Sequence, residues 1–66
     1  MKNLPKKKRE EKKLTQETTG ACLGLKRVTI AQYEAKKRFP RKDILPKYAK
    51  LLGITTDEYV KWYNSR

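Results

Sequence analysis

The 66-residue chain contains no histidine and one cysteine, Cys22. A disulfide framework needs at least two cysteines, and ordinary zinc sites use several cysteine or histidine ligands, so the sequence excludes both. We expect Cys22 to be a small buried hydrophobe in a reducing cytoplasm, because a redox-sensing thiol would have no second cysteine to resolve it. No metal, other cofactor or small-molecule ligand is expected.

The chain also lacks a long apolar run. Its first residues have no apolar stretch of the kind that secretory signals carry, and no segment approaches the roughly 20 apolar residues that span a membrane. We therefore expect neither a signal peptide nor a membrane span. The length allows one domain, residues 1–66, with a core near the lower size limit for folding without a metal or disulfide.

Acidic residues are scarce. Seven Asp and Glu stand against eighteen Lys and Arg, which gives a net charge of +11. The basic residues cluster in segment 1–13 (MKNLPKKKREEKK) and segment 36–42 (KKRFPRK). Such a charge favours polyanions, with nucleic acid ahead of an anionic membrane surface, although a merely solvated basic surface is the alternative. The scattered acids and the lack of histidine argue against an enzyme.

Residues 16–35 (QETTGACLGLKRVTIAQYEA) contain two short helical patterns separated by a glycine turn. Gly20 falls where two helices would cross closely, and Gly24 falls where the first must end in a left-handed residue. Four apolar residues at helical spacing can close a wedge of core: Leu23, Leu25, Ile30 and Tyr33. This arrangement predicts a helix-turn-helix whose second helix, about 26–35, presents Lys26, Arg27, Val28, Ala31 and Gln32 outward.

Three further helices are expected, which makes the fold an all-α bundle of five short helices. Asn3 can cap the first, but few apolar residues precede Leu14, so that helix should be short, partly frayed and anchored chiefly at its C-terminal end. The fourth should run over about 42–52, with Phe39 before it plugging the core. The last, 56–64, should begin with a capping box formed by Thr55 and Glu58.

The chain resembles the lambda-repressor-like, or Cro/XRE, class of helix-turn-helix DNA-binding proteins over residues 4–60. The first part of the match comprises Leu14-Thr15-Gln16-Glu17, Gly20, Leu23-Gly24-Leu25, Thr29-Ile30 and Tyr33-Glu34. Its continuation comprises Leu45-Pro46, Ala49, Leu52-Gly53-Ile54 and Asp57. The chain departs from the class at Lys8 and Thr19, where an aliphatic residue is usual, and at Lys26, where Ser or Thr commonly caps the helix.

The resemblance implies which residues meet the bases of double-stranded DNA. Arg27, Val28 and Gln32 match base-contacting positions, and Ala31 is small enough for the helix to lie deep in the groove. Arginine pairs with guanine, glutamine with adenine, and an apolar side chain packs on the thymine methyl. For Arg27 the alternative is contact with phosphate alone.

Phosphate contacts are expected around that helix. Gln16 matches a residue that contacts a phosphate and steadies the recognition helix. The basic loop after the helix is placed to clamp the DNA backbone. The predicted phosphate-contacting residues are Gln16, Lys26, Lys36, Lys37, Arg38 and Arg41. For segment 1–13, phosphate contact and simple solvation stay open.

Two more predictions concern residues away from the bases. The resemblance pairs Arg9 with Glu34 in a structural salt bridge, and Glu34 is the sole acid between Thr18 and Lys42, so it needs a partner. The aromatic residues of the last helix, Tyr59, Trp62 and Tyr63, exceed what a small core readily buries. They either fold back onto the domain or form a dimer interface, and related phage proteins favour the dimer.

Together these features predict a cytoplasmic, sequence-specific transcription regulator. The expected mechanism is that of a dimeric Cro-like repressor, from a phage or mobile element, which occludes a pseudo-palindromic operator. Two other functions stay open. One is an antitoxin whose main partner is a toxin protein. The other is a basic RNA- or ribosome-associated module, although the chain lacks the aromatic platform that single-stranded RNA readers use.

Overall fold

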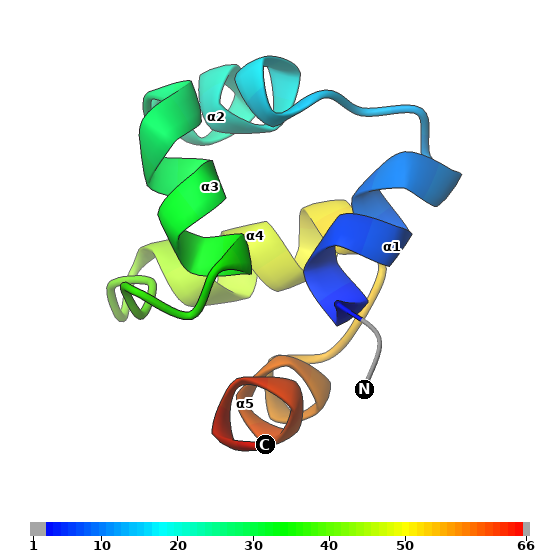
Figure 1. Cartoon of the computed structure of the whole chain (residues 1–66), viewed down its shortest axis with the longest axis vertical. Coiled ribbons are helices and arrows are strands. Elements are labelled where there is room, and N and C mark those ends of the chain that lie inside the picture. Colours follow the sequence, from blue (N-terminus) through cyan, green and yellow to red (C-terminus); the bar gives the residue numbers. More distant parts are fainter. Residues whose placement is uncertain (1–2, 66) are drawn as a thin grey trace.

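The computed structural model describes residues 3–65, and the ends of the predicted segments 1–13 and 1–66 lie outside that range. The described residues form five α-helices and no strand, so the all-α prediction is confirmed. The helices are α1 Leu4–Glu11, α2 Gln16–Leu23, α3 Arg27–Glu34, α4 Ile44–Leu52 and α5 Thr56–Asn64 (Figure 1). Across residues 3–65, every helix is too short or too polar to cross a membrane.

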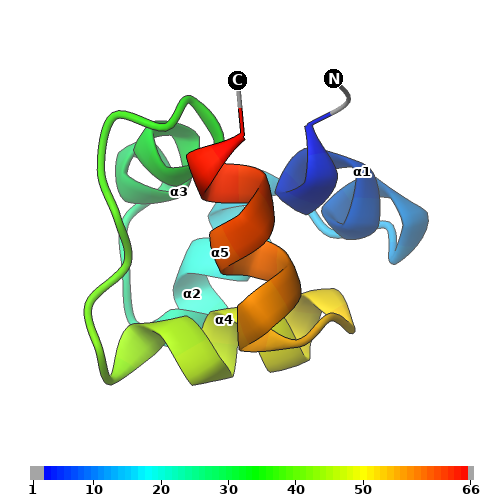
Figure 2. The same ribbon diagram turned by 90° about the horizontal axis from the view of Figure 1, so that it is seen from below.

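The helix-turn-helix consists of α2 and α3, which pack on each other across a sharp turn. Helix α4 lies between α2 and α5 and contacts both, and α1 packs against α4 and α5 (Figures 1 and 2). One side of α3 is buried against the bundle, while the residues on its other side are exposed or half-buried in the structure of residues 3–65.

Three helices begin with a side-chain cap. Asn3 and Thr15 each accept a hydrogen bond from a backbone N–H in the first turn of α1 and α2. Thr55 and Glu58 form the predicted capping box, at 3.1 and 3.0 Å. The hydrogen bond from the Thr55 backbone N–H lowers the pKa of the Glu58 carboxyl. Helix α3 has no such cap, since Lys26 cannot accept a hydrogen bond.

The turn between α2 and α3 explains two glycines. Gly24 has a φ of +69°, and its N–H donates to Ala21 O while the Leu25 N–H donates to Gly20 O at 2.7 Å. This pair of hydrogen bonds is a Schellman motif. A Cβ on Gly20 would lie 2.7 Å from Leu25 O, so the backbone of the turn, rather than a helix crossing, requires glycine there.

Helices α1 and α3 end with the same pair of hydrogen bonds but without glycine. Lys13 and Lys36 occupy the left-handed position, each with a φ of +58°. The hydrogen bonds from Leu14 N–H to Arg9 O and from Lys37 N–H to Gln32 O are both 2.9 Å long. A side chain in this conformation is strained, so both lysines stabilise the native turn less than glycine would.

The core lies between α3, α4 and α5 and is largely aromatic. Tyr33, Tyr48, Tyr59 and Trp62 are buried, and neighbouring rings in this series are 5.5 to 5.7 Å apart. The other members of this buried core cluster are Ile30, Ala49, Leu52 and Ile54. Tilted and edge-to-face packing of this kind stabilises a pair beyond its buried area.

Several local predictions differ from the structure. Cys22 is exposed, because α2 turns Thr19 and Gly20 toward the interior and leaves Cys22 on its outer side. Phe39 is 43% exposed and packs edge-on against Tyr63, outside the core. Helix α4 begins at Ile44, two residues later than predicted.

Helix α1 is held at both ends, where the sequence predicted anchoring chiefly at its C-terminal end. Pro5 is fully buried, and the Asn3 side-chain amide donates to Glu34 O at 2.7 Å. At the other end of α1, Arg9 is also buried. The spacing of apolar residues did not predict the attachment of the N-terminal end of α1, because a proline and an amide side chain provide it.

Candidate nucleic-acid interface

The outward side of α3 carries the residues predicted to meet DNA bases. Arg27 and Val28 are exposed, with Val28 at 59%, while Ala31 and Gln32 are half-buried. Positions i, i+1, i+4 and i+5 share one side of a helix. The buried residues Ile30 and Tyr33 fix the opposite side to the core. An exposed valine beside an arginine on a supported helix suits the apolar and polar edges of a DNA groove.

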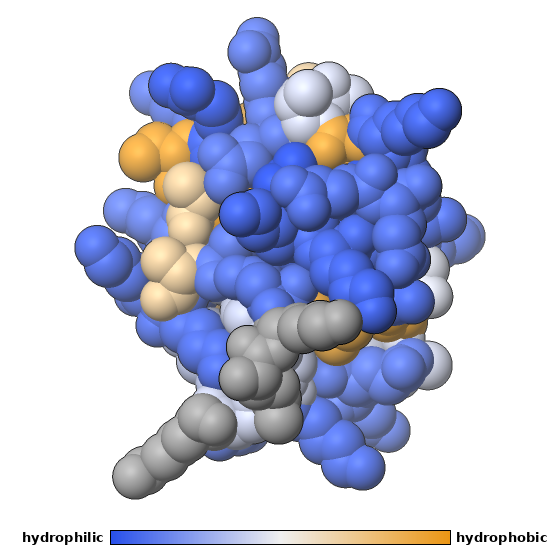
Figure 3. Space-filling model, turned by 45° about the vertical axis from the view of Figure 1, so that its right-hand side comes forward, coloured by the Kyte–Doolittle hydropathy of each residue, from blue (hydrophilic) through white to orange (hydrophobic). Residues whose placement is uncertain are grey.

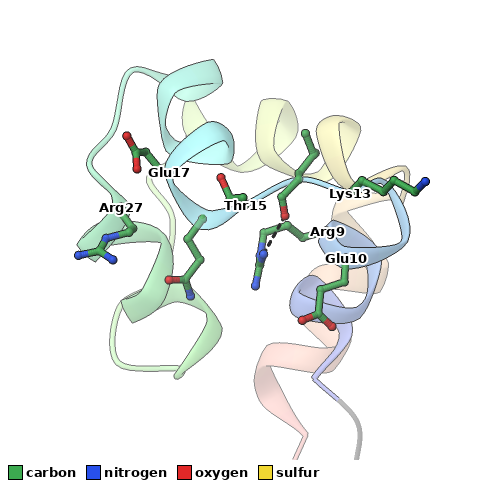
Figure 4. A pocket seen from close by; sticks show the side chains of 8 residues that line it. Arg9, Glu10, Lys13, Thr15, Glu17 and Arg27 are labelled. Carbon is green, nitrogen blue, oxygen red and sulfur yellow. Dashed lines mark hydrogen bonds between the residues drawn. The ribbon is translucent and has the colours of Figure 1, made fainter.

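Arg27 lies at the rim of a groove of about 530 Å³ between the end of α1 and the starts of α2 and α3 (Figure 4). The acids Glu10 and Glu17 also line this groove. Within residues 3–65, neither acid forms an ion pair with Arg27. Its guanidinium group therefore remains available to a partner outside the chain.

A buried ion pair holds the other end of α3. Arg9 Nε lies 2.7 Å from Glu34 Oε2, and Arg9 Nη2 lies 3.4 Å from Glu34 Oε1. Arg9 Nη1 also donates to Leu14 O at 2.8 Å. The structure thus contains the salt bridge that the resemblance implies. The hydrogen bond to Glu34 raises the pKa of Arg9 above its ordinary value, so the guanidinium group stays charged.

Glu34 connects three segments of the chain. Besides Arg9 of α1, it accepts a hydrogen bond from Gln16 Nε2 at the start of α2, at 3.1 Å. Its backbone carbonyl accepts the bond from Asn3. Gln16 therefore steadies the recognition helix, and its contact with a phosphate stays a prediction. The resemblance implied that Gln16 steadies this helix, but its partner Glu34 and the hydrogen bond of Asn3 were not predicted, because amides carry no pairing signal.

The loop between α3 and α4 exposes Lys37, Arg38 and Arg41, and Lys26 is exposed at the cap of α3. Among residues 3–65 the ion pairs are Lys8–Glu11 and Arg9–Glu34, so no acid neutralises these four cations. Figure 3 shows a largely hydrophilic face on which apolar atoms form small, separate patches. Because its exposed cations have no acidic partner among residues 3–65, the loop can present concentrated positive charge beside the recognition helix.

Lys36 differs from its neighbours in the loop. Its Nζ donates to Ser65 O at 2.7 Å and lies 4.7 Å from the centre of the Trp62 ring. The Tyr63 hydroxyl donates to Lys36 O at 3.4 Å. This ammonium group interacts with the carbonyl of the residue that caps the C-terminal end of α5 and with an aromatic face, both of which favour a cation. We therefore assign Lys36 to the attachment of α5 and remove it from the phosphate-contacting set.

The C-terminal aromatic residues are folded onto the domain. Tyr59 is fully buried, Trp62 is 6% exposed, and Tyr63 is half-buried. The predicted dimer interface needs correction at Tyr59 and Trp62, because both have almost no surface left for a second copy. A contact through Tyr63 stays a prediction. Their rings extend the aromatic series of α3 and α4, which gives α5 a large apolar contact.

A family model described as helix-turn-helix matches residues 6–59. The chain therefore belongs to the Cro/C1-type helix-turn-helix family, the XRE family, and is a lambda-repressor-like DNA-binding protein. Membership indicates a transcription regulator that binds double-stranded DNA. Neither the curated proteins nor the solved structures give a match.

Proposed function

We propose that the chain is a sequence-specific, Cro-like repressor, encoded by a phage or mobile element, that acts in the cytoplasm by occluding an operator. The observation that carries the proposal is the exposed side of α3, with Arg27 and Val28 outward and no acid paired with Arg27 among residues 3–65. The opposite side of α3 is fixed by the core, and its end is fixed by Glu34. A rigid helix with free polar and apolar side chains suits direct reading of base edges.

Each side chain on this surface has a defined partner chemistry. Arg27 offers two parallel donors to guanine O6 and N7, and Gln32 offers a donor and an acceptor to adenine N6 and N7. Val28 packs on a thymine methyl, and Ala31 leaves room for close approach. The backbone contacts come from Gln16, Lys26, Lys37, Arg38 and Arg41. In this scheme the phosphates supply most of the affinity and α3 supplies the specificity.

Occlusion works best if two copies bind one operator. In a dimer, two recognition helices would enter successive major grooves about 34 Å apart on one side of a pseudo-palindrome. The interface between the copies uses surfaces other than the buried Tyr59 and Trp62. The bound pair would block polymerase without any chemical step, so the protein acts as a binding module rather than an enzyme.

Selection of bound duplexes from a random-sequence pool at near-physiological salt tests the proposal. We expect enrichment of an inverted repeat whose half-sites lie about one helical turn apart. Enrichment of a single half-site would support sequence recognition and contradict binding as a dimer. No enrichment, with binding that disappears as salt rises, would contradict sequence-specific reading. Stronger competition by RNA than by duplex DNA would favour the RNA-associated alternative.

A further inference from the structure

A second groove, of about 460 Å³, lies between α2 and α4. Its lining residues are Cys22 and Leu23 from α2 and Lys47, Lys50 and Leu51 from α4. No residue of α3 or of the basic loop lines it. The groove is therefore separate from the surface that we assign to DNA.

The groove combines an apolar floor with a basic edge. Leu23 and Leu51 are half-buried, and Lys47 and Lys50 are exposed. The two lysines are three residues apart, so they lie on one side of α4. Within the described part of the chain neither lysine forms an ion pair, and no acid lines the groove.

We propose that this groove docks an acidic amphipathic helix of a partner protein. Carboxylates spaced three or four residues apart on such a helix can face Lys47 and Lys50, while an apolar side chain lies over Leu23 and Leu51. The apolar floor favours a peptide over a nucleic acid, whose phosphates gain nothing from it. The net charge of +11 disfavours a second copy of this chain as the occupant.

The proposal is independent of operator binding. Since α3 and its basic loop take no part in the groove, a partner helix could dock while the recognition helix is on DNA. The groove would then connect the DNA-bound protein to an acidic regulator or to a protein of the transcription machinery.

A defined probe tests the docking. The probe is a helical peptide of about four turns with leucines along one side and glutamates flanking them; one control peptide has serine for leucine, and another has glutamine for glutamate. Cys22 supplies a reporter on the natural chain, because it is the sole cysteine, is exposed and lines the groove. At a peptide concentration about ten times the Kd, we expect maleimide labelling of Cys22 to slow about tenfold. Neither control peptide should slow it.

Two double variants that lose the same charge distinguish peptide binding at the groove from nonspecific attraction of an acidic peptide to a basic protein. Lys47→Ala with Lys50→Ala should weaken peptide binding about fivefold and leave operator affinity within about twofold. Lys37→Ala with Arg38→Ala should weaken operator binding and leave the affinity for the peptide within about twofold. Circular dichroism of both variants checks that the helices remain folded.

Four results would overturn the proposal: no peptide binding, binding that leaves Cys22 labelling unchanged, equal loss of peptide binding in both double variants, or protection of Cys22 by duplex DNA. Protection of Cys22 that grows with protein concentration alone would instead identify a second copy as the occupant. Failure of the operator experiment leaves the peptide result unaffected, so the two proposals fail separately.

Discussion

At the scale of single residues, the fold depends on a buried carboxylate that bonds to α1 and to the start of α2. Arg9→Met leaves Glu34 buried without its cation, and we expect the free energy of unfolding to fall by about 3 kcal/mol. Urea denaturation monitored by circular dichroism measures the change. Lys8→Met is a matched control on α1, since Lys8 forms an exposed pair with Glu11 at 3.6 Å and should cost less than about 0.5 kcal/mol. Similar losses in the two variants would contradict the structural role of Arg9.

A second prediction at this scale concerns Arg27 and the sequence specificity of DNA binding. If its guanidinium group reads a guanine, Arg27→Ala relaxes the preference at one base position of each half-site and costs about 1–3 kcal/mol on the preferred sequence. Binding to a panel of single-base operator variants measures this. Lys26→Ala, which removes a neighbouring exposed cation, should weaken binding to all sequences alike. If Arg27→Ala also weakened all sequences equally, its contact would be with phosphate.

At the scale of an element, the ends of the helices contain removable strain. Lys13 has a φ of +58° in the motif that ends α1, where glycine carries no Cβ penalty. We expect Lys13→Gly to raise the free energy of unfolding by about 1 kcal/mol. Lys12→Gly is the control, because Lys12 has a φ of −91° and glycine there should destabilise by about 0.5 kcal/mol. Thermal unfolding that ranked the two variants in the opposite order would contradict this account of the helix end.

We expect the exposed cations of the basic loop between α3 and α4 to contact phosphates as a unit. Lys37→Ala with Arg38→Ala removes two exposed cations, so the slope of log K against log salt should become shallower by about 2 per bound copy. Titrations of specific and random duplexes at several salt concentrations measure this, and both kinds of DNA should lose affinity. Lys47→Ala with Lys50→Ala should leave the slope unchanged. An unchanged slope in the loop variant would remove the loop from the phosphate contacts.

At the scale of the whole molecule, the aromatic core makes stability depend on alkaline pH. Burial raises the pKa of Tyr48 and of Tyr59 far above the ordinary value of about 10. Both hydroxyls lack a hydrogen-bond partner among residues 3–65. Above about pH 10 the folded state therefore keeps these phenols neutral, while in the unfolded chain they ionise. Their contribution to stability is complete below about pH 10 and is lost as the pH rises further.

We therefore expect the chain to unfold cooperatively in strong alkali, with the absorbance of tyrosinate rising as helicity falls. Tyr48→Phe keeps the ring and removes one ionisable, unpaired hydroxyl. It should raise the free energy of unfolding at neutral pH by about 1 kcal/mol and shift alkaline unfolding to higher pH. Tyr63→Phe is the control, because Tyr63 is half-buried and its hydroxyl donates to Lys36 O. An unchanged alkaline transition in Tyr48→Phe would contradict the role given to burial.

Many features of the individual helices and turns could be predicted from the sequence because their determinants are local. Gly24 must be left-handed, Thr55 and Glu58 form a cap within one turn, and Ile30 and Tyr33 repeat at helical spacing. The lone acid in a basic stretch indicated that Glu34 has a partner, and the family resemblance implied that this partner is Arg9, as the structure shows. The contacts with DNA bases and phosphates stay predictions.

The remaining features depended on which surfaces the bundle covers. Trp62 is buried because α5 packs its aromatic rings onto the core, and Cys22 is exposed because α2 turns Thr19 and Gly20 inward instead. Lys36 left the phosphate-contacting set because tertiary packing places the end of α5 beside it. The sequence by itself thus determined the helices and their caps, because both depend on neighbours within about one helical turn. It also determined the charge of the loop, which follows from composition alone. Only the packing of α5, α1 and α4 decided which of the charged and aromatic side chains remain at the surface, because that depends on contacts between residues far apart in the chain.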